Sequence, residues 1–116
     1  MSVYLKVLTW DLNPLLVLSE LGIKWEKIFI KWEKILDRWG IYKYNGFRCC
    51  TNEELKIKYL KKIEKICKVL HDKYGKHIEL ILVLDILDKQ GTSGVIIDKE
   101  SLAFIHRMWA EIDIIN

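Results

Sequence analysis

Residues 78–87 read Ile-Glu-Leu-Ile-Leu-Val-Leu-Asp-Ile-Leu, and this stretch decides the fold class. Apolar side chains occupy both faces over most of its length, which is typical of a central strand that is covered on both sides. Its uninterrupted apolar centre, residues 80–84, ends at Asp85 and is far shorter than a membrane-spanning helix. The stretch therefore predicts a buried strand within a sheet.

A long helix is predicted just before this strand, over about residues 52–74. Thr51-Asn52-Glu53-Glu54 has the pattern of a capping box, in which the hydroxyl and the last carboxylate bind free amides of the first turn. Lys73 suits the negative end of a helix, and Gly75 suits its stop. The apolar spacing predicts a buried face made of Leu55, Tyr59, Leu60, Ile63, Ile66, Cys67 and Leu70.

The segments after the central strand are shorter. Asp88 to Gly94 holds two glycines and is predicted to be a loop, followed by a short extended piece at 95–97. Asp98 is predicted to cap a helix over about residues 99–110. Residues 112–115 are predicted to form the last strand.

The N-terminal part predicts a strand followed by a helix. Residues 2–10 alternate and are rich in β-forming side chains, which indicates a strand. Asn13 can cap the next helix, and Pro14 suits its first position. The helix is expected over residues 15–21, because Gly22 can take the left-handed conformation that a helix end requires.

A tryptophan-bearing repeat follows. Lys24-Trp25-Glu26-Lys27-Ile28 recurs seven residues later as Lys31-Trp32-Glu33-Lys34-Ile35. We predict a helix across residues 24–39, because the apolar side chains then form one stripe made of Trp25, Ile28, Phe29, Trp32, Ile35, Leu36 and Trp39. A strand is the alternative, because the apolar residues Ile28, Ile30 and Trp32 also alternate.

The order of these elements indicates an α/β (α+β) fold. Gly40 ends the repeat, and residues 41–44 are predicted to form a strand that stops at the turn signal Asn45-Gly46. The chain is expected to be a single domain, residues 1–116, because its length leaves no room for a second core. We expect a single mixed β-sheet of about four or five strands with three to four helices packed against it.

Composition excludes several classes of protein. The chain is 51% hydrophobic and 30% charged, which is typical of globular rather than disordered proteins. A net charge of +3 is too mild to indicate a nucleic-acid or membrane binder. Three cysteines, of which Cys49 and Cys50 are adjacent, make no disulfide framework, and the first residues lack the pattern of a signal peptide. We therefore expect a cytoplasmic protein without a membrane anchor or a cofactor.

Three parts of the chain carry a family resemblance. The opening strand is followed by Asp11-Leu12-Asn13-Pro14 and then by Leu21-Gly22-Ile23, and a Trp39-centred strand precedes the long helix. The closing half holds Val95-Ile96-Ile97-Asp98, a helix, and Ala110-Glu111-Ile112-Asp113-Ile114. In these parts the chain resembles the bacterial family catalogued as domain of unknown function 4279, whose members are short standalone α/β proteins.

The resemblance implies the architecture but no activity, because the family has no established one. Two features depart from the family pattern. Ile115 stands where the family usually has a second acidic residue after Asp113, and residues 24–38 are apolar where the family is polar and loop-like. Small bacterial proteins of this kind often serve as immunity or counter-defence factors, so the resemblance favours such a role.

Three features could carry chemistry, but each is incomplete. Cys67 and His71 stand four residues apart on a predicted helix, yet no further ligands have zinc-site spacing. The loop 88–94 lacks the ending of a phosphate-binding loop. The long helix has many lysines but almost none of the residues that read bases. We therefore expect no catalytic residue and no metal site, and the alternatives are nucleic-acid binding through residues 52–74 or small-ligand binding.

Tryptophan is the unusual residue, with five in 116. A helical aromatic stripe is usually core, but a domain of this size has little room for five indole rings, and exposed tryptophan marks protein interfaces. Acidic residues also collect near the C-terminal strands, where they could steer a basic partner. We therefore predict a partner-binding surface made of Trp25, Phe29, Trp32, Trp39, Asp85, Asp88 and Asp113.

The expected function is non-enzymatic. We expect stoichiometric binding of another protein, such as a toxin or a defence protein, which the chain would inhibit by occlusion. In this hypothesis the tryptophans are the anchors and the acidic residues steer a basic target. Self-association through the same stripe is a close variant, because an exposed apolar helix can pair with its own copy.

Overall fold

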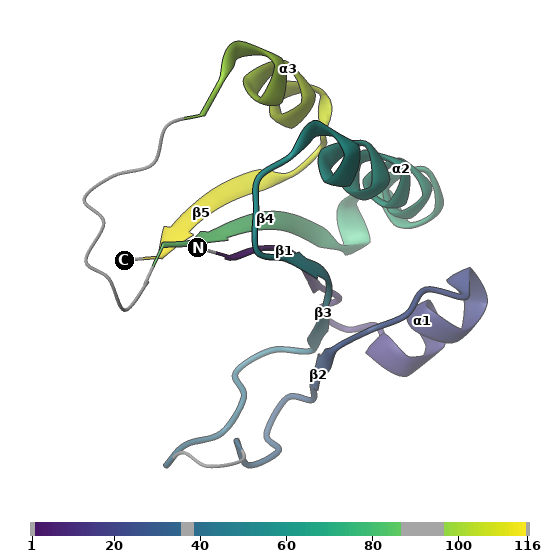
Figure 1. Ribbon diagram of the computed structural model, residues 1–116. Coiled ribbons are helices and arrows are strands. Elements are labelled where there is room, and N and C mark those ends of the chain that lie inside the picture. Colours follow the sequence, from purple (N-terminus) through teal and green to yellow (C-terminus); the bar gives the residue numbers. More distant parts are fainter. Residues whose placement is uncertain (1, 36–38, 87–96, 116) are drawn as a thin grey trace.

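The structure, a computed structural model, describes residues 2–35, 39–86 and 97–115 (Figure 1). It confirms the predicted fold class, because a single mixed sheet of five strands has three helices packed against it. The elements in chain order are β1 (Ser2–Leu8), α1 (Pro14–Leu21), β2 (Lys27–Phe29), β3 (Gly46–Asn52), α2 (Ile57–Tyr74), the 3-10 turn η1 (Gly75–His77), β4 (Glu79–Asp85), α3 (Lys99–Arg107) and β5 (Glu111–Ile115).

The sheet has the strand order β2-β3-β1-β4-β5. The strand β1 lies at the centre and is antiparallel to both β3 and β4, and β2 is antiparallel to β3. From β1 to β4, this order and pairing are those of a split βαβ, or ferredoxin-like, unit. The helix α3 then adds β5, which is parallel to β4. This fold alone does not indicate a function, because many activities share it.

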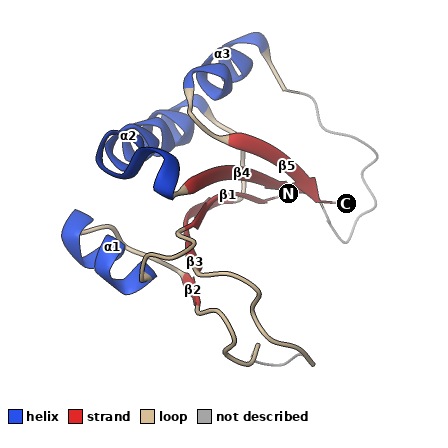
Figure 2. Cartoon of the chain, turned by 180° about the vertical axis from the view of Figure 1, so that it is seen from behind, coloured by secondary structure: helices blue, strands red, loops and turns tan. Residues whose placement is uncertain are grey.

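The three helices cover one face of the sheet (Figures 1 and 2). Val3, Leu5 and Val7 of β1 point toward them and are buried, whereas Tyr4 and Lys6 point to the opposite face and are partly exposed. The alternation along β1 thus separates a core face from an open face. The helices contribute to the core the side chains Val17, Leu18, Leu60, Ile63, Cys67, Leu70 and Ile105, and Met108 directly after α3 adds to it.

The predicted signals around α1 are confirmed. The Asn13 side chain accepts a hydrogen bond from the Leu15 amide at 2.9 Å, and Pro14 occupies the first helical position. Gly22 ends the helix with a left-handed φ of 62°. These features depend on residues that are close together in the sequence, so local chemistry was sufficient to predict them.

The helix predicted over residues 24–39 is wrong. Residues 27–29 form the short strand β2, which pairs with β3 by opposing Lys27 to Arg48 and Ile28 to Phe47. This partner lies about twenty residues away in the sequence, and its pairing overrides the local helical period. The alternative strand interpretation holds for Ile28 but not for Trp32, which lies in a turn with a φ of 73°.

The strand predicted over residues 41–44 is also wrong, because β3 begins only at Gly46. A Cβ atom on Gly46 would lie 2.3 Å from the Val7 carbonyl oxygen, so glycine allows the close approach of β3 to β1. Asn45 makes no hairpin turn. Its side chain instead accepts a hydrogen bond from the Lys31 amide at 2.8 Å and donates one to the Trp10 carbonyl at 2.7 Å.

The predicted capping box at residues 51–54 is wrong as well. Thr51 belongs to β3, and its amide and hydroxyl both donate hydrogen bonds to the Glu26 carboxylate. The helix α2 begins at Ile57, after an N-cap residue, Lys56, whose side chain makes no capping bond. Its end at Tyr74, followed by Gly75, is confirmed. Of the predicted buried face, Leu60, Ile63, Cys67 and Leu70 are buried, and Leu55, Tyr59 and Ile66 are partly exposed.

The C-terminal predictions are largely confirmed. In β4 the adjacent residues Leu82, Val83 and Leu84 are all buried, so both faces of this strand are covered there. The Asp98 side chain caps α3 by accepting a hydrogen bond from the Ser101 amide at 2.8 Å. The helix ends at Arg107, before the predicted Ala110, and β5 starts at Glu111. The predicted loop 88–94 and residues 95 and 96 lie outside the described residues.

Candidate functional site

All five tryptophans lie at the surface. Their exposed fractions are 48% for Trp10, 51% for Trp25, 69% for Trp32, 100% for Trp39 and 50% for Trp109. Tryptophan is usually well buried, and an exposed group of large apolar side chains commonly marks a contact surface. The core of this fold is built without any of these indole rings.

Trp32 and Trp39 belong to the connection between β2 and β3, residues 30–45, which we call the β2–β3 arm. Figure 2 shows this connection extending away from the sheet. Its two sides are joined by hydrogen bonds from the Trp32 amide to the Tyr42 carbonyl at 2.9 Å and from the Tyr42 amide to the Glu33 carbonyl at 3.0 Å. Lys34 and Ile41 form an isolated bridge farther out. The described part of the arm, residues 30–35 and 39–45, is thus an irregular ribbon with many exposed side chains.

The predicted binding residue Phe29 anchors the root of the arm instead of being exposed. It is only 9% exposed, and its ring packs against Tyr42 with centroids 5.3 Å apart. Tyr44 meets it edge-on at 6.5 Å and accepts a hydrogen bond from Lys6 Nζ at 2.8 Å. This aromatic cluster fixes the arm to the open face of the sheet. Phe29 therefore belongs to the buried root of the arm and not to its exposed surface.

A second contact orients the arm on the side of α1. The Asn45 side chain joins the arm to the turn after β1, where Trp10 has a left-handed φ of 48°. A shallow hollow of about 390 Å³ lies between this turn, α1 and the arm. It is lined by Asp11, Asn13, Pro14, Leu15, Ile30, Glu33 and Asn45. Leu15 at its rim is 51% exposed, so apolar surface continues from the arm onto α1.

The surroundings of the tryptophans are basic. Residues 24–48 hold seven lysine or arginine residues against three acidic ones. Two of the lysines lie over indole rings, with Lys31 Nζ 5.3 Å from the Trp32 centroid and Lys34 Nζ 5.9 Å from the Trp39 centroid. Such cation–π pairs keep a long side chain against the ring at modest free-energy gain. The surface around the arm is therefore both aromatic and positively charged.

The predicted acidic residues lie at the other edge of the sheet. Asp85 ends β4 and Asp113 lies in β5, whereas Asp88 falls outside the described residues. The pairing of Asp113 with Val83 places it on the open face. Burial raises the pKa of Glu79 in β4, and the nearby Glu111 carboxylate of β5 adds to the rise. The structure therefore separates the predicted acidic residues from the predicted tryptophans by the width of the sheet.

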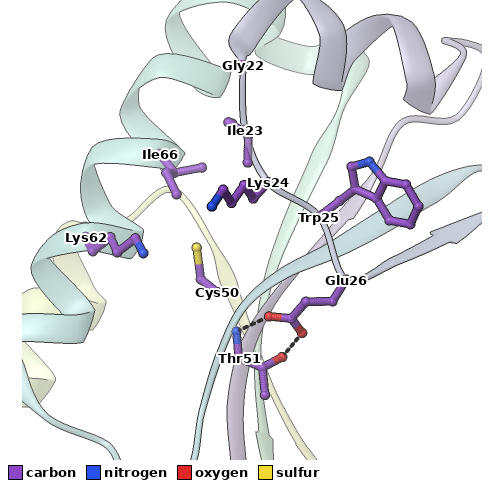
Figure 3. A pocket seen from close by; sticks show the side chains of 9 residues that line it. All are labelled: Gly22, Ile23, Lys24, Trp25, Glu26, Cys50, Thr51, Lys62 and Ile66. Atoms are coloured by element: carbon purple, nitrogen blue, oxygen red, sulfur yellow. Dashed lines mark hydrogen bonds between the residues drawn. The ribbon is translucent and has the colours of Figure 1, made fainter.

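A second hollow lies between α2, β3 and the segment after α1 (Figure 3). Its volume is about 570 Å³. Figure 3 shows Cys50 Sγ and the Lys24 and Lys62 ammonium groups pointing into it, with the Trp25 indole on the far side. Glu26 at its rim is held by Thr51 and lies 3.7 Å from Arg48 Nε. Ile23 and Ile66 give the hollow an apolar wall.

Cys50 reaches this hollow because β3 is irregular, whereas the adjacent Cys49 belongs to the core. The register of β3 against β1 shifts between the pairs Leu5–Cys49 and Val3–Asn52, which is the pattern of a β-bulge. Cys50 occupies the bulge with a left-handed φ of 59°, a position that usually holds glycine. In a regular strand, neighbouring side chains would point to opposite faces. Here the Cys49 thiol is buried and hydrogen-bonded to the Cys50 sulfur.

The hydrogen bond from Cys49 lowers the pKa of Cys50 to about 7, and the positive charge of Lys62 acts in the same direction. Burial and the Glu26 carboxylate oppose this decrease. The pKa of Cys49 is raised, mainly because its thiol is the donor of that hydrogen bond and also because it is buried. Cys50 is therefore the thiol of this pair that ionises near neutral pH, and a thiolate is the nucleophilic form of cysteine.

The other sequence-derived candidates have the following surroundings. Cys67 is fully buried, and burial raises its pKa to about 12. His71 stacks on Trp109 with ring centroids 4.6 Å apart. Across the described ranges, no group of three or more His, Cys, Asp or Glu side chains could hold a metal ion. On the lysine-rich side of α2, Lys73 pairs with Glu20 at 3.1 Å and Lys61 lies over Phe104.

Sequence reasoning missed the Cys50 hollow. It requires a bulge in β3, the turn after α1 and one side of α2, and these segments come together only in the folded chain. The adjacent pair Cys49-Cys50 was the signal available in the sequence, and it was used only to exclude a disulfide framework. A strand prediction across residues 46–52 would have placed the two thiols on opposite faces. The bulge could not be predicted from cysteine alone.

Comparisons with known proteins give no relative. No protein family matches the chain, and neither do curated proteins or solved structures. The resemblance to the family catalogued as domain of unknown function 4279 therefore stays a prediction. Its Trp39-centred strand is not present, because Trp39 lies in a bend of the β2–β3 arm. Within the described parts of the chain, no helix combines the length and the apolar character needed to cross a bilayer.

Proposed function

We propose that this chain is a non-enzymatic protein-binding module that inhibits a partner by stoichiometric occlusion, in the manner of small immunity or counter-defence proteins. The β2–β3 arm and the segment before β2 supply the anchors, Trp25, Trp32 and Trp39. The observation that carries the proposal is their exposure, which is about half or more for each ring. Tryptophan is the residue type most enriched among interface anchors.

Exposure of these rings is costly to the free protein. Large apolar surface in contact with water is unfavourable, and it also promotes aggregation. Trp32 adds a backbone cost, because a side chain in the left-handed region costs about 1 kcal/mol. The exposure of these rings does not stabilise the fold, whereas it is required if the rings bind a partner.

The charge around the arm indicates the chemistry of the partner surface. The lysines beside Trp32 and Trp39 fit an acidic patch rather than a basic one, since like charges in an interface are costly. Asp85 and Asp113 lie at the far edge of the sheet, so they can steer a basic region only in a partner that spans the sheet. The anchoring contact itself is therefore proposed to meet an acidic protein surface.

The experiment is a binding comparison between two tryptophan variants. The variant Trp25→Ala, Trp32→Ala, Trp39→Ala removes the anchors. Trp109→Ala is the control, because Trp109 is about as exposed as Trp25 but lies next to β5. Proteins that co-purify with the wild type from its native host are identified, produced alone and titrated. We expect one-to-one binding that the triple variant weakens more than a hundredfold, since each anchor contributes about 2 kcal/mol. The Trp109→Ala variant should bind like the wild type.

Other outcomes would overturn the proposal. Equal loss in both variants would mean that exposed tryptophan in general, and not the arm, controls binding. Retention on polynucleotide that falls with salt and with Lys-to-Glu changes on α2 would favour the nucleic-acid alternative. Arm-dependent binding to anionic vesicles would favour a membrane surface. Sedimentation of the pure protein over a range of concentrations tests the self-association variant.

A further inference from the structure

The hollow beside β3 brings a nucleophile and two positive charges to one place. Figure 3 shows Cys50 Sγ on the floor, with the Lys24 and Lys62 side chains reaching over it from the segment after α1 and from α2. The three residues come from separate parts of the chain, so their convergence is a property of the fold. The hollow, at about 570 Å³, has room for a small ligand rather than a single ion.

The local charges favour an anionic reagent at Cys50. Glu26 is the acidic residue at the rim, and its carboxylate accepts two hydrogen bonds from Thr51 and faces Arg48. Part of its charge is therefore compensated by these contacts, whereas the lysines Lys24 and Lys62 both point into the hollow. Ile23 and Ile66 add apolar surface near the thiol. The site thus combines soft nucleophilic sulfur with positive charge and a partly apolar wall.

We propose that Cys50 is a site of mixed-disulfide formation with anionic low-molecular-weight disulfides, whose carboxylates are recognised by Lys24 and Lys62. Oxidised glutathione is the probe of this ligand class. The proposal stands apart from the protein-binding function, because it concerns a different group of atoms, although Trp25 borders both. Either one can fail while the other holds.

The reaction is a thiol–disulfide exchange. The Cys50 thiolate attacks one sulfur of the reagent, a new S–S bond forms to Cys50 Sγ, and the S–S bond of the reagent breaks. The other half of the reagent leaves as a thiolate and takes a proton from solvent. Cys50 is oxidised, the reagent is reduced, and no further oxidant is needed. The product is one mixed disulfide per chain.

The exchange should stop at this product. Cys49 is the neighbouring thiol, but it is fully buried and remains protonated as the donor to Cys50. A protonated thiol is a poor nucleophile, so it does not readily expel the bound half-reagent. Cys67 is buried on α2 and is likewise protected. A stable adduct at Cys50 is therefore expected rather than an internal disulfide.

The test compares three disulfides of different charge on the reduced protein at neutral pH. They are oxidised glutathione (anionic), bis(2-hydroxyethyl) disulfide (neutral) and cystamine (cationic), and intact mass with peptide mapping follows the adduct. Each rate for the wild type is divided by the rate for Lys62→Gln. Each of these ratios is then divided by the ratio for the neutral reagent, which corrects for any change that the substitution makes in the thiolate population of Cys50. We expect the corrected ratio to be roughly fivefold for the anionic reagent and below one for cystamine, with both effects reduced at high salt.

Controls keep the proposal falsifiable. Lys68→Gln, also on α2 but outside the hollow, should react like the wild type, and Cys50→Ser should form no adduct. Alkylation with neutral iodoacetamide should rise through a midpoint near pH 7, and Lys62→Gln should move this midpoint upward. Equal corrected ratios for all three disulfides, or labelling of Cys49 or Cys67, would overturn the proposal. A loss of two hydrogen masses without an adduct would show an internal disulfide and would contradict the proposed mixed disulfide at Cys50.

Discussion

Three non-glycine residues of the described structure have left-handed backbone: Trp10, Trp32 and Cys50. Each lies at a surface or hollow considered above, and none lies in a helix or in a regular part of the sheet. Side chains rarely adopt this conformation because Cβ then approaches the following carbonyl oxygen. Strain of this kind persists where the surroundings or a function require it. The three unfavourable backbone conformations therefore lie at the turn that holds the arm, in the arm itself and at the Cys50 hollow.

The strain at Trp32 leads to a stability prediction. Replacing Trp32 by glycine should leave the free energy of unfolding unchanged or raise it by up to about 1 kcal/mol, because the left-handed cost disappears and little buried surface is lost. Chemical denaturation of the wild type and the variant measures this. Trp39→Gly is the control, since Trp39 is more exposed but not left-handed, and it should give no gain. A large loss of stability in Trp32→Gly would show that the ring has a structural role.

Caps and strand pairing show how far local sequence determines the elements. Asn13 and Asp98 were predicted as caps and act as caps, because each needs only an amide two or three residues away. Thr51 has the same local signal but bonds to Glu26, because β2 brings that carboxylate beside β3. A residue with the local pattern of a helix cap can therefore bond instead to a group that is distant in the sequence, when the fold brings that group close. The sequence pattern contains no information on that competition.

The Asp98 cap gives a pH-dependent prediction. Hydrogen bonds from Ser101 lower the pKa of Asp98 below its ordinary value of 3.8. The stabilisation is therefore complete above that value and is lost as the pH falls through the lower folded pKa. Asp98→Asn keeps a capping oxygen but does not titrate, so the difference in melting temperature between wild type and variant should shrink below about pH 4. Thermal unfolding followed by circular dichroism at several pH values measures it. A constant difference would contradict the assignment.

The helix predicted from the seven-residue repeat is the clearest wrong prediction of a secondary-structure element. The period of the repeat fits a helix, yet Lys27 to Phe29 form a strand and the tryptophans of the two copies have different backbone conformations. Helical periodicity records which residues are apolar, and it predicts burial only if those residues enter the core. Here the apolar residues of the repeat divide between the buried root, Phe29, and exposed rings. Apolar residues that are exposed in the structure therefore follow the same helical spacing as those of a buried helix face.

Charge is distributed unevenly across the whole molecule. The strands β2 and β3 carry Lys27 and Arg48 and no acidic residue, whereas β4 and β5 carry Glu79, Asp85, Glu111 and Asp113 and no basic residue. The net charge of +3 conceals this separation. Composition alone therefore argued against a nucleic-acid or membrane binder, although the strands at the two edges of the sheet carry charges of opposite sign. Such a distribution can orient an approaching partner before contact.

The arm gives a prediction at the scale of the molecule. Replacing residues 33–41 by Gly-Asn-Gly should keep the sheet and change the free energy of unfolding by about 1 kcal/mol or less, because the root cluster of Phe29, Tyr42 and Tyr44 is preserved. The proposed partner contact should weaken strongly, since Trp39 and the surface beside it are removed. Denaturation and the same titration measure both effects. Unfolding of the shortened chain would show that the arm supports the fold.

The candidate surface was predictable in part. The abundance of tryptophan in a small chain correctly indicated that indole rings would remain exposed, because the volume of the core is limited. Their distribution was not predictable, since it depends on a connection between two strands that sequence analysis interpreted as a helix. Asp85 and Asp113 were predicted to act together with the tryptophans. The strand order instead places the two aspartates near one edge of the sheet and the β2–β3 arm at the other. Residue type thus predicted that indole rings would be exposed, and only the topology showed which of the named residues lie close together.

The Asn45 side chain carries a consequence beyond its two hydrogen bonds. It offers an oxygen to the Lys31 amide and a nitrogen to the Trp10 carbonyl, so it needs a donor and an acceptor on one short side chain. Aspartate has the same length but loses the donor, and its charge would face a carbonyl oxygen. The direction in which the arm points therefore depends on this one amide group as well as on the aromatic cluster at the root of the arm. A change at Asn45 would reorient Trp32 and Trp39 while leaving both rings intact.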